Sequence, residues 1–418
     1  MRFSRSVFEA SCEAVAGALR FEGPADAVLS AYFRSHPKLG QQERSTVAET
    51  VYAVLRRKRL LEHLIPAASI REAVLAGWAV LLGANLRELE DLASPSELRS
   101  LADAKRAAHS PLPLEVECEM PDWLMHRLRE RFDEASLREL CEGLLRPAPL
   151  DLRVNLVKIT RKEALARLSA DGIAARPTPY SPVGLRIDGK PSINRHALFE
   201  QGALEVQDEG SQLLCYLVAP RRGEMVADFC AGAGGKTLAL GMLMRSSGRL
   251  YAFDVSQARL GKLKPRLARS GLSNVHPQRL ENEHDVRLGR LRGKMDRVLV
   301  DAPCSGLGTL RRNPDLKWRQ TPQAVEEMAL KQRSILASAA RLVKPGGRLV
   351  YATCSLLAEE NSRVVEDFLA AQPEWAIVPA GEALQQERIP LSMGHYLELW
   401  SHLHGTDGFF AAVLRRKG

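Results

Sequence analysis

The sequence predicts an α/β protein whose C-terminal half forms a doubly wound, mostly parallel sheet, preceded by a small α+β domain and an all-helical N-terminal domain. Three observations support this fold class. From about residue 206 onward, apolar segments of strand length alternate with segments of helical periodicity. Residues 1–105 carry apolar side chains at helical spacing, and residues 147–205 show a β-α-β-β pattern.

Length and composition agree with a globular protein of several domains. The chain has 418 residues, of which 45% are hydrophobic and 26% are charged, and this length exceeds that of one ordinary core. No apolar run is long enough to span a bilayer, and the charged N-terminus lacks the apolar core of a secretory signal. We therefore expect a cytoplasmic protein with no membrane partner, and we expect it to be a monomer.

Net charge and cysteine spacing narrow the choice of partners. The formal net charge is +9, which suits a polyanionic partner such as RNA but is equally compatible with a merely basic surface. The seven cysteines include no Cys-x-x-Cys pair. We therefore expect no metal site, and no disulfide scaffold in a reducing compartment.

The first half of the chain divides at changes in periodicity. Residues 1–105 should form the helical domain, and residues 106–146 a proline-containing linker and a further helical segment. In residues 147–205, Leu150–Asn155 alternates like a strand, Arg161–Gly172 has helical spacing, and two turn-rich strands follow. Such a small α+β sheet is a common RNA-recognition platform, but it would equally serve to brace the neighbouring domain.

Residues 206–418 should form a Rossmann-like domain, because strands and helices alternate in the order of a doubly wound sheet. In this fold the ligand lies at the carboxyl ends of the strands. The last strand has no helix after it and could close the sheet antiparallel. The expected strands are Met225–Cys230, Arg249–Val255, Val275–Leu280, Asp296–Ala302, Arg348–Cys354 and Gly408–Leu414, and the expected helices are Lys236–Arg245, Gln257–Ser270, Pro322–Leu342 and Glu359–Ala370.

The first of these strands ends in a glycine-rich loop, Asp228-Phe229-Cys230-Ala231-Gly232-Ala233-Gly234-Gly235-Lys236-Thr237. A phosphate-binding P-loop would need glycine in place of Cys230, and a dinucleotide fingerprint would need glycine or alanine in place of Thr237. The third interpretation is S-adenosylmethionine, with an acid at the end of the second strand binding the ribose; Asp254 stands there. The loop by itself does not separate a dehydrogenase from a methyltransferase.

Two cysteines lie at the expected ligand edge. The fourth strand ends in Asp301-Ala302-Pro303-Cys304-Ser305-Gly306, and the fifth ends in Ala352-Thr353-Cys354-Ser355. One cysteine at a strand end is usually a packing residue, but two at the ends of adjacent strands, beside an acid, indicate chemistry. Carbon 5 of cytosine is a poor nucleophile until a thiolate adds to carbon 6, and an acid at ring nitrogen 3 stabilises the charge that develops. Asp301 is placed for that role.

In order and spacing, these motifs resemble the Nop/Sun family of RNA cytosine-5 methyltransferases, together with Gln207-Asp208-Glu209-Gly210-Ser211 and Asp407-Gly408-Phe409-Phe410. The resemblance covers roughly residues 120 to 418. It implies that Cys354 is the nucleophile, that Cys304 assists release of the methylated RNA, and that Lys236 and Asp301 belong to the catalytic group. It also implies an S-adenosylmethionine site made of Cys230, Ala231, Gly232, Ala233, Gly234, Gly235, Lys236, Asp254 and Asp301.

The sequence departs from the family pattern at two places. The family loop usually reads Cys-Ala-Ala-Pro-Gly-Gly-Lys, whereas this chain has Gly232-Ala233 and lacks the rigidity of the proline. The acid expected after the third strand, on the adenosine side, is Asp285 by best match, with Glu281 as the alternative.

Basic residues after the Pro-Cys strand suit RNA contacts. Arg311, Arg312, Lys317, Trp318 and Arg319 combine positive charge with one aromatic ring, although a solvated surface loop would look the same. The N-terminal helices are similar to the antitermination-factor-like domain of bacterial ribosomal RNA members of the family, which favours small-subunit ribosomal RNA over transfer RNA. A catalytically idle RNA-binding assembly factor and a nicotinamide-dependent dehydrogenase are the rival functions.

Overall fold

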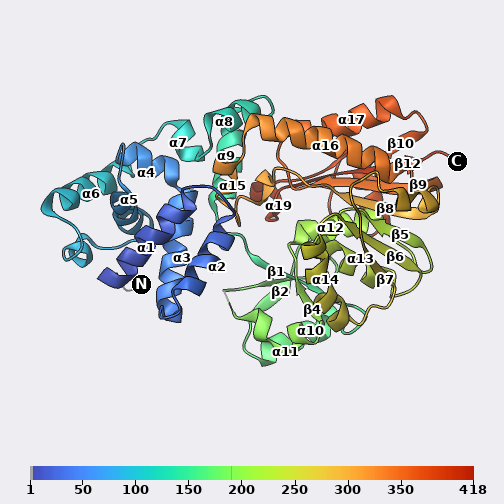
Figure 1. Cartoon of the computed structure of the whole chain (residues 1–418), viewed down its shortest axis with the longest axis horizontal. Coiled ribbons are helices and arrows are strands. Elements are labelled where there is room, and N and C mark those ends of the chain that lie inside the picture. Colours follow the sequence, from blue (N-terminus) through green and yellow to red (C-terminus); the bar gives the residue numbers. More distant parts are fainter. Residues whose placement is uncertain (1–2, 190) are drawn as a thin grey trace. The chain divides into compact units, whose positions relative to one another are not determined.

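The computed structural model describes residues 3–189 and 191–418 (Figure 1). The chain divides into two compact units. The residues up to Pro147 form the first unit together with Thr309–Pro322, and Ala148–Gly308 forms the second together with Gln323–Gly418. In the ranges that the structure describes, none of the helices combines the length and the apolar character needed to cross a bilayer.

Between residues 3 and 147 the structure contains helices and turns and no strand, as the apolar spacing predicts. The core forms around Trp78, whose indole N–H donates to Thr50 Oγ1 at 2.8 Å. The helix after Ser94 begins with a capping box, because Ser94 and Glu97 exchange hydrogen bonds. The helices are α1 (Arg5–Ala18), α2 (Ala25–Ser35), α3 (Gln41–Arg56), α4 (Lys58–Leu64), α5 (Ile70–Ala76), α6 (Pro95–Ala107), α7 (Leu114–Cys118), α8 (Asp122–Arg129) and α9 (Glu134–Leu145), with the short turns η1 (Gly77–Leu81) and η2 (Leu86–Leu89).

The segment Thr309–Pro322, which contains α15 (Leu316–Arg319), packs within the first unit. Lys317 Nζ donates to Arg56 O at 3.1 Å, and the indole N–H of Trp318 donates to Leu55 O at 2.9 Å. The predicted boundaries include this segment in residues 206–418, whereas in the structure it packs with the residues of the first unit. The reason is that the segment buries its side chains against α3 rather than against the sheet.

Residues 148–206 of the second unit form a four-stranded antiparallel sheet in the order β2-β3-β1-β4. Leu152 lies opposite Leu185 and Val206, and the leucine pair is fully buried. The expected β-α-β-β pattern is present, with a fourth strand at the edge next to β1. The elements are β1 (Leu150–Val154), α10 (Arg161–Ala170), β2 (Ala175–Pro177), β3 (Gly184–Ile187), η3 (Ile193–Arg195), α11 (Ala197–Glu200) and β4 (Leu204–Val206).

The rest of the second unit is built on a large sheet in the order β10-β12-β9-β8-β5-β6-β7, with β11 paired to β12. The five strands from β9 to β7 are parallel, and β12 closes against β9 antiparallel, as expected for a final strand without a helix. The chain reverses direction across the sheet between β5 and β8, so a crevice opens at their carboxyl ends. The strands are β5 (Met225–Asp228), β6 (Arg249–Asp254), β7 (Val275–Arg279), β8 (Met295–Asp301), β9 (Val343–Thr353), β10 (Trp375–Val378), β11 (Leu397–Leu399) and β12 (Phe409–Arg416).

Helices cover both faces of this sheet, which confirms the doubly wound class. Leu217 and Leu238 belong to the core on one face, and Leu336 and Val364 to the core on the other. Figure 1 shows α16 and α17 along one side and α12, α13 and α14 along the other. Their bounds are α12 (Glu209–Val218), α13 (Gly235–Leu243), α14 (Gln257–Ser270), α16 (Pro322–Ala340) and α17 (Ser362–Ala371); the remaining elements are α18 (Ala380–Gln386), α19 (Ser401–His404), η4 (Val286–Leu291), η5 (Leu307–Thr309) and η6 (Ala358–Glu360).

Candidate active site

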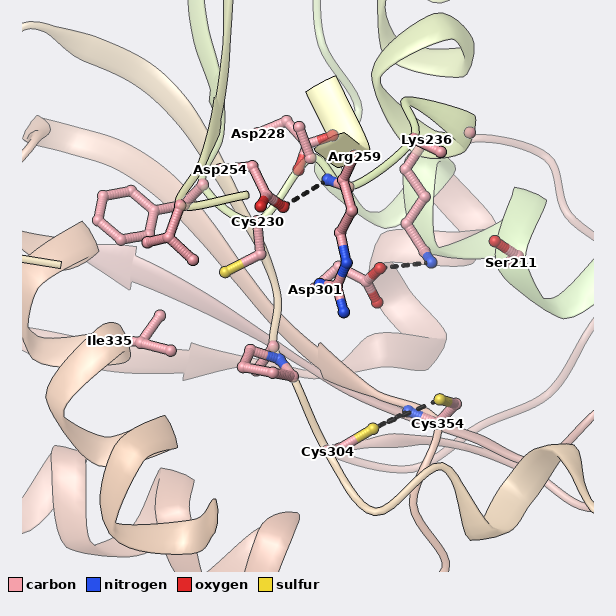
Figure 2. A pocket seen from close by; sticks show the side chains of 18 of the residues that line it. Ser211, Asp228, Cys230, Lys236, Asp254, Arg259, Asp301, Cys304, Ile335 and Cys354 are labelled. Atoms are coloured by element: carbon pink, nitrogen blue, oxygen red, sulfur yellow. Dashed lines mark hydrogen bonds and ion pairs between the residues drawn. The ribbon is translucent and has the colours of Figure 1, made fainter. Parts of the chain in front are cut away.

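A cavity of about 690 Å³ lies at the carboxyl edge of the large sheet. The ends of β5, β6, β8 and β9 supply its polar side chains, among them Asp228, Asp254, Asp301, Cys304 and Cys354 (Figure 2). These residues come from four strands that are neighbours in the sheet, so the topology brings together what the sequence separates by more than a hundred positions. The cavity is therefore the expected ligand site of the fold.

The glycine loop between β5 and α13 has a defined shape. Gly234 has φ of +86°, and a Cβ atom there would lie 2.2 Å from a Leu263 methyl group, so only glycine fits. The N–H of Gly232 donates to Asp254 Oδ2 at 2.8 Å. The carbonyl groups of Ala233 and Gly235 accept hydrogen bonds from arginine side chains outside the loop, Arg266 and Arg153, at 2.7 Å each. These contacts restrain the loop at the place where the family has proline.

Asp254 ends β6 inside the cavity, as the sequence predicts. Its Oδ2 accepts the N–H of Gly232, and its Oδ1 accepts the N–H of Ser256 at 2.7 Å. A carboxylate offers about four acceptor positions, so two remain for a ligand. This geometry suits the two hydroxyl groups of a ribose.

Asp228 also lines the cavity, although the sequence motifs did not predict a role for it. Its Oδ2 accepts the hydroxyl of Thr237 at 2.6 Å, whereas its buried Oδ1 has no hydrogen-bond partner of good geometry among the described residues. Burial raises the pKa of the Asp228 carboxyl to about 7. The carboxyl group is therefore an acceptor, and near neutral pH a negative charge, that a cationic ligand would stabilise.

Lys236 and Asp301 form an ion pair across the cavity, with Lys236 Nζ 2.7 Å from Asp301 Oδ2 (Figure 2). Burial lowers the pKa of the Lys236 ammonium, but the charge of Asp301 outweighs that effect and the net shift is upward. Lys236 therefore stays charged and fixes the orientation of the Asp301 carboxylate.

The two predicted cysteines are neighbours, with Cys304 Sγ 3.4 Å from Cys354 Sγ (Figure 2). The backbone N–H of Cys354 also donates to Cys304 Sγ at 3.4 Å. The hydrogen bond with Cys354, together with burial, raises the pKa of the Cys304 thiol well above its usual value. This shift favours the neutral thiol form of Cys304.

A buried carboxylate, Glu360, ties together the two loops that carry the cysteines. Its Oε1 accepts the N–H of Ser305 at 2.8 Å and the amide of Gln332 at 3.0 Å. Its Oε2 accepts the hydroxyl of Ser305 at 2.5 Å and that of Ser355. Each serine directly follows one cysteine, so Glu360 sets the spacing of the thiols without lining the cavity itself. The sequence analysis did not predict a role for Glu360, because no motif or periodicity around this residue distinguishes it from a surface glutamate.

The acid on the third-strand side is Glu283, which lines the cavity. It accepts hydrogen bonds from Lys331 at 2.6 Å and Ser334 at 2.7 Å. Asp285, the sequence-based choice, does not line the cavity; it accepts the N–H of Glu281 and pairs with Arg287, so it holds a turn. Of the two acids, Glu283 is therefore the one placed to contact a ligand in this cavity.

The predicted RNA-contact segment is only partly accessible. Arg311 and Lys317 are buried, at 8% and 2% exposed, and burial lowers the pKa of the Lys317 ammonium to about 8. Trp318 is held by its bond to Leu55 O. Arg311 and Lys317 are therefore not available to RNA in this structure, whereas Arg312, Trp318 and Arg319 remain partly exposed.

The carboxylates and apolar side chains of the cavity fit one of the three ligands that the glycine loop left open. S-adenosylmethionine carries a ribose, an adenine ring and a cationic end, and has no pyrophosphate. Carboxylates at Asp228 and Asp254 suit the cationic end and the ribose, and the apolar side chains of Val255, Leu280 and Ile335 suit the adenine ring. The fold and the cavity together define an S-adenosylmethionine-dependent methyltransferase.

Comparison with known proteins agrees with this class. Residues 215–415 match the family model described as 16S rRNA methyltransferase RsmB/F, and residues 120–194 match the ferredoxin-like domain of these methyltransferases. The chain is 32% identical to the "Probable ribosomal RNA small subunit methyltransferase B" of Synechocystis, over 94% of this chain and 95% of that protein. It therefore belongs to the RsmB/F family, the Nop/Sun methyltransferases that its motifs resemble.

Two further similarities extend over the whole chain. The protein of the same description from Bacillus subtilis is 28% identical over 99% of both chains. A crystal structure of the protein PH0851 superposes with a TM-score of 0.79 at 27% identity, and the match covers 100% of both chains. The chain is thus an RNA methyltransferase that uses S-adenosylmethionine. The described residues contain no group of three or more His, Cys, Asp or Glu side chains placed to hold a metal ion.

Proposed function

We propose that this protein methylates carbon 5 of a cytosine in small-subunit ribosomal RNA through a covalent adduct between Cys354 and carbon 6 of the base. The observation that carries the proposal is the pair of thiols, 3.4 Å apart, in the cavity that also holds Asp301. Methylation of a nucleophilic amine would need no thiol, whereas carbon 5 of cytosine must be activated.

In this mechanism Cys354 attacks carbon 6 as a thiolate, and the electron density of the ring moves toward carbon 5 and nitrogen 3. Asp301, oriented by Lys236, faces nitrogen 3, and the Lys236–Asp301 pair supplies the proton that nitrogen 3 takes up as negative charge develops there. When bound, S-adenosylmethionine supplies the methyl group on a sulfonium. The acids of the cavity hold it, and the protein's own task is to make carbon 5 nucleophilic.

Release of the product needs transfer of the carbon 5 proton to solvent and cleavage of the bond from carbon 6 to sulfur, the electron pair of the C–H bond re-forming the double bond between carbons 5 and 6. Cys354 then leaves with the electron pair, as a thiolate. The neutral thiol of Cys304, 3.4 Å away, is placed to donate a hydrogen bond to that departing sulfur. This is the basis for proposing Cys304 as the residue that assists release.

The choice of substrate rests on the relatives. Those from Synechocystis and Bacillus subtilis are named as ribosomal RNA small subunit methyltransferases. The cytoplasm, as the site of action, and the monomeric state belong to the same proposal. The idle assembly factor is disfavoured because a scaffold has no use for the paired thiols.

Bisulfite sequencing of total RNA from cells with and without the gene tests this function. We expect one cytosine of the small-subunit ribosomal RNA to become unprotected when the gene is deleted and to regain protection when the wild-type gene is restored. Loss of protection in a transfer RNA alone would contradict the proposed substrate, and no change at any cytosine would contradict the proposed chemistry.

A further inference from the structure

We propose that α14 binds the phosphates of the RNA substrate through a basic stripe beside the cofactor cavity; the inference rests on the proposed function. The α14 stripe consists of Arg259, Lys262, Arg266 and Arg269. The helix carries five basic residues, Lys264 being the fifth, and no acidic residue.

The stripe lies on one face of α14. Its members are three, four and three positions apart, which places them in one row along a helix. Arg259, Lys262 and Arg266 line the same cavity as Asp301 and Cys354. An RNA strand that delivers a base to Cys354 therefore passes within reach of this row.

The four members differ in what holds them. Glu205 of the small sheet pairs with Arg266 at 2.8 Å and with Arg269 at 2.5 Å, and Arg266 also donates to the glycine loop. Arg259 and Lys262 are exposed, and among the described residues no acidic side chain is within ion-pair distance of either. Two cations of the stripe, Arg266 and Arg269, are thus held by Glu205, and the other two, Arg259 and Lys262, are exposed.

Folding does not account for the two available cations. Like charges at three- and four-residue spacing destabilise a helix by a few tenths of a kcal/mol per pair, roughly 0.2–0.5. Arg259 and Lys262 carry that cost without an acidic partner in the same protein. An external polyanion removes the repulsion and gains affinity through counterion release.

Two anions could bind this surface, the RNA backbone or the carboxylate of the cofactor. RNA fits it better, because a single carboxylate needs one cation, whereas the stripe has a row of four basic side chains. The predicted basic segment at 311–319 has buried two of its cations, Arg311 and Lys317, in the first unit. The α14 stripe therefore places two exposed cations, Arg259 and Lys262, at the cavity, where those two buried cations cannot contribute.

The test uses the full-length protein and a fluorescein-labelled single-stranded fragment of small-subunit ribosomal RNA, with affinity measured by anisotropy over a range of salt concentrations. Arg259→Gln combined with Lys262→Gln should lower the affinity roughly tenfold and reduce the slope of log affinity against log salt by about 1.4, or ~0.7 for each lost contact. Lys264→Gln, on the same helix but outside the stripe, should leave the affinity and the slope unchanged. The Kd for S-adenosylmethionine, measured by calorimetry on the same variants, should change less than the affinity for RNA.

Three results would overturn the proposal: an unchanged slope in the double variant, an equal loss in the Lys264→Gln control, or weakened cofactor binding with RNA affinity intact. The last would show that the stripe serves the carboxylate of the cofactor. The assay measures RNA binding and not methyl transfer. It therefore tests the stripe even if the protein does not methylate carbon 5 of cytosine.

Discussion

At the residue scale, the two active-site thiols depend on a carboxylate that they do not touch. Glu360 accepts hydrogen bonds from Ser305 and Ser355, the residues that follow the two cysteines. An amide at this position would present one oxygen acceptor and one NH2 donor group in place of two acceptors, so at least one of these bonds would be lost. We expect Glu360→Gln to lower kcat by about 10- to 100-fold, since small displacements of reacting groups cost that much.

Separate kinetic constants show whether Glu360 positions the thiols or merely stabilises the fold. The Kd for S-adenosylmethionine should stay within about twofold, because Glu360 does not line the cavity. Glu209→Gln is the matched control: Glu209 is also fully buried, and it accepts N–H groups of the small-sheet region. If both variants lower the melting temperature equally and neither lowers the kcat of the folded protein, the positioning role is wrong.

The carboxyl group of Asp228 should make cofactor binding depend on pH. Burial raises its pKa to about 7, so it is neutral below that pH and negative above it. The cationic end of S-adenosylmethionine prefers the ionised form, so the Kd of the wild type should fall as the pH rises from about 6 to 8, relative to that of Asp228→Asn. Titration of the cofactor itself is common to both proteins and cancels in the ratio. A ratio that does not change with pH would contradict the assignment.

The sequence predicted the residues at strand ends better than those in loops. Cys304, Cys354 and Asp301 follow strands of a recognisable pattern, so the topology of the fold brings them to one edge. Glu283 and Glu360 reach their places through the path of a loop and a short turn, which no local pattern specifies. What identifies these two glutamates is their hydrogen bonding to side chains of α16, and this contact cannot be read from the sequence.

At the element scale, the parallel strands end where the sequence predicts, within one or two residues. The short strands β10 and β11 were not predicted, because pairing with β12 stabilises them rather than a pattern of their own. β9 begins at Val343, before the predicted Arg348, since the glycines between them allow the pairing with β8 to start early. The central strands of a sheet are thus easier to predict than its edges.

The glycine loop is the element whose shape matters most for the cofactor. We expect Gly234→Ala to raise the Kd for S-adenosylmethionine at least tenfold, because φ of +86° costs roughly 1–2 kcal/mol for alanine and the new methyl group would collide with Leu263. Gly232→Ala is the control in the same loop, since its φ is also positive but no atom lies within 4 Å of the added Cβ. Calorimetry that finds equal losses for the two variants would contradict the steric part of this account.

At the scale of the whole molecule, the first unit contains a segment from far along the chain. Asp315 accepts the N–H of Ala25, and Lys317 and Trp318 donate to the end of α3. The peptide between Pro147 and Ala148 is therefore not the only link between the N-terminal helices and the rest of the chain.

Cleavage at an engineered protease site between these two residues should leave the two fragments associated on a sizing column. Trp318→Ala combined with Lys317→Ala should weaken that association, because it removes two hydrogen bonds and a partly buried aromatic ring, worth a few kcal/mol. Arg388→Ala, a surface change in the second unit, serves as the control. If the fragments separate at once after cleavage when Lys317 and Trp318 are both present, the anchoring role of this segment is contradicted.

The central claim is that Cys354 forms the bond to RNA and Cys304 helps to break it. The most direct measurement incubates each single variant with substrate RNA and S-adenosylmethionine and separates the products on a denaturing gel. We expect Cys304→Ala to accumulate a covalent protein–RNA adduct and Cys354→Ala to form none and to transfer no methyl group. An adduct in Cys354→Ala and none in Cys304→Ala would reverse the two roles and contradict the mechanism.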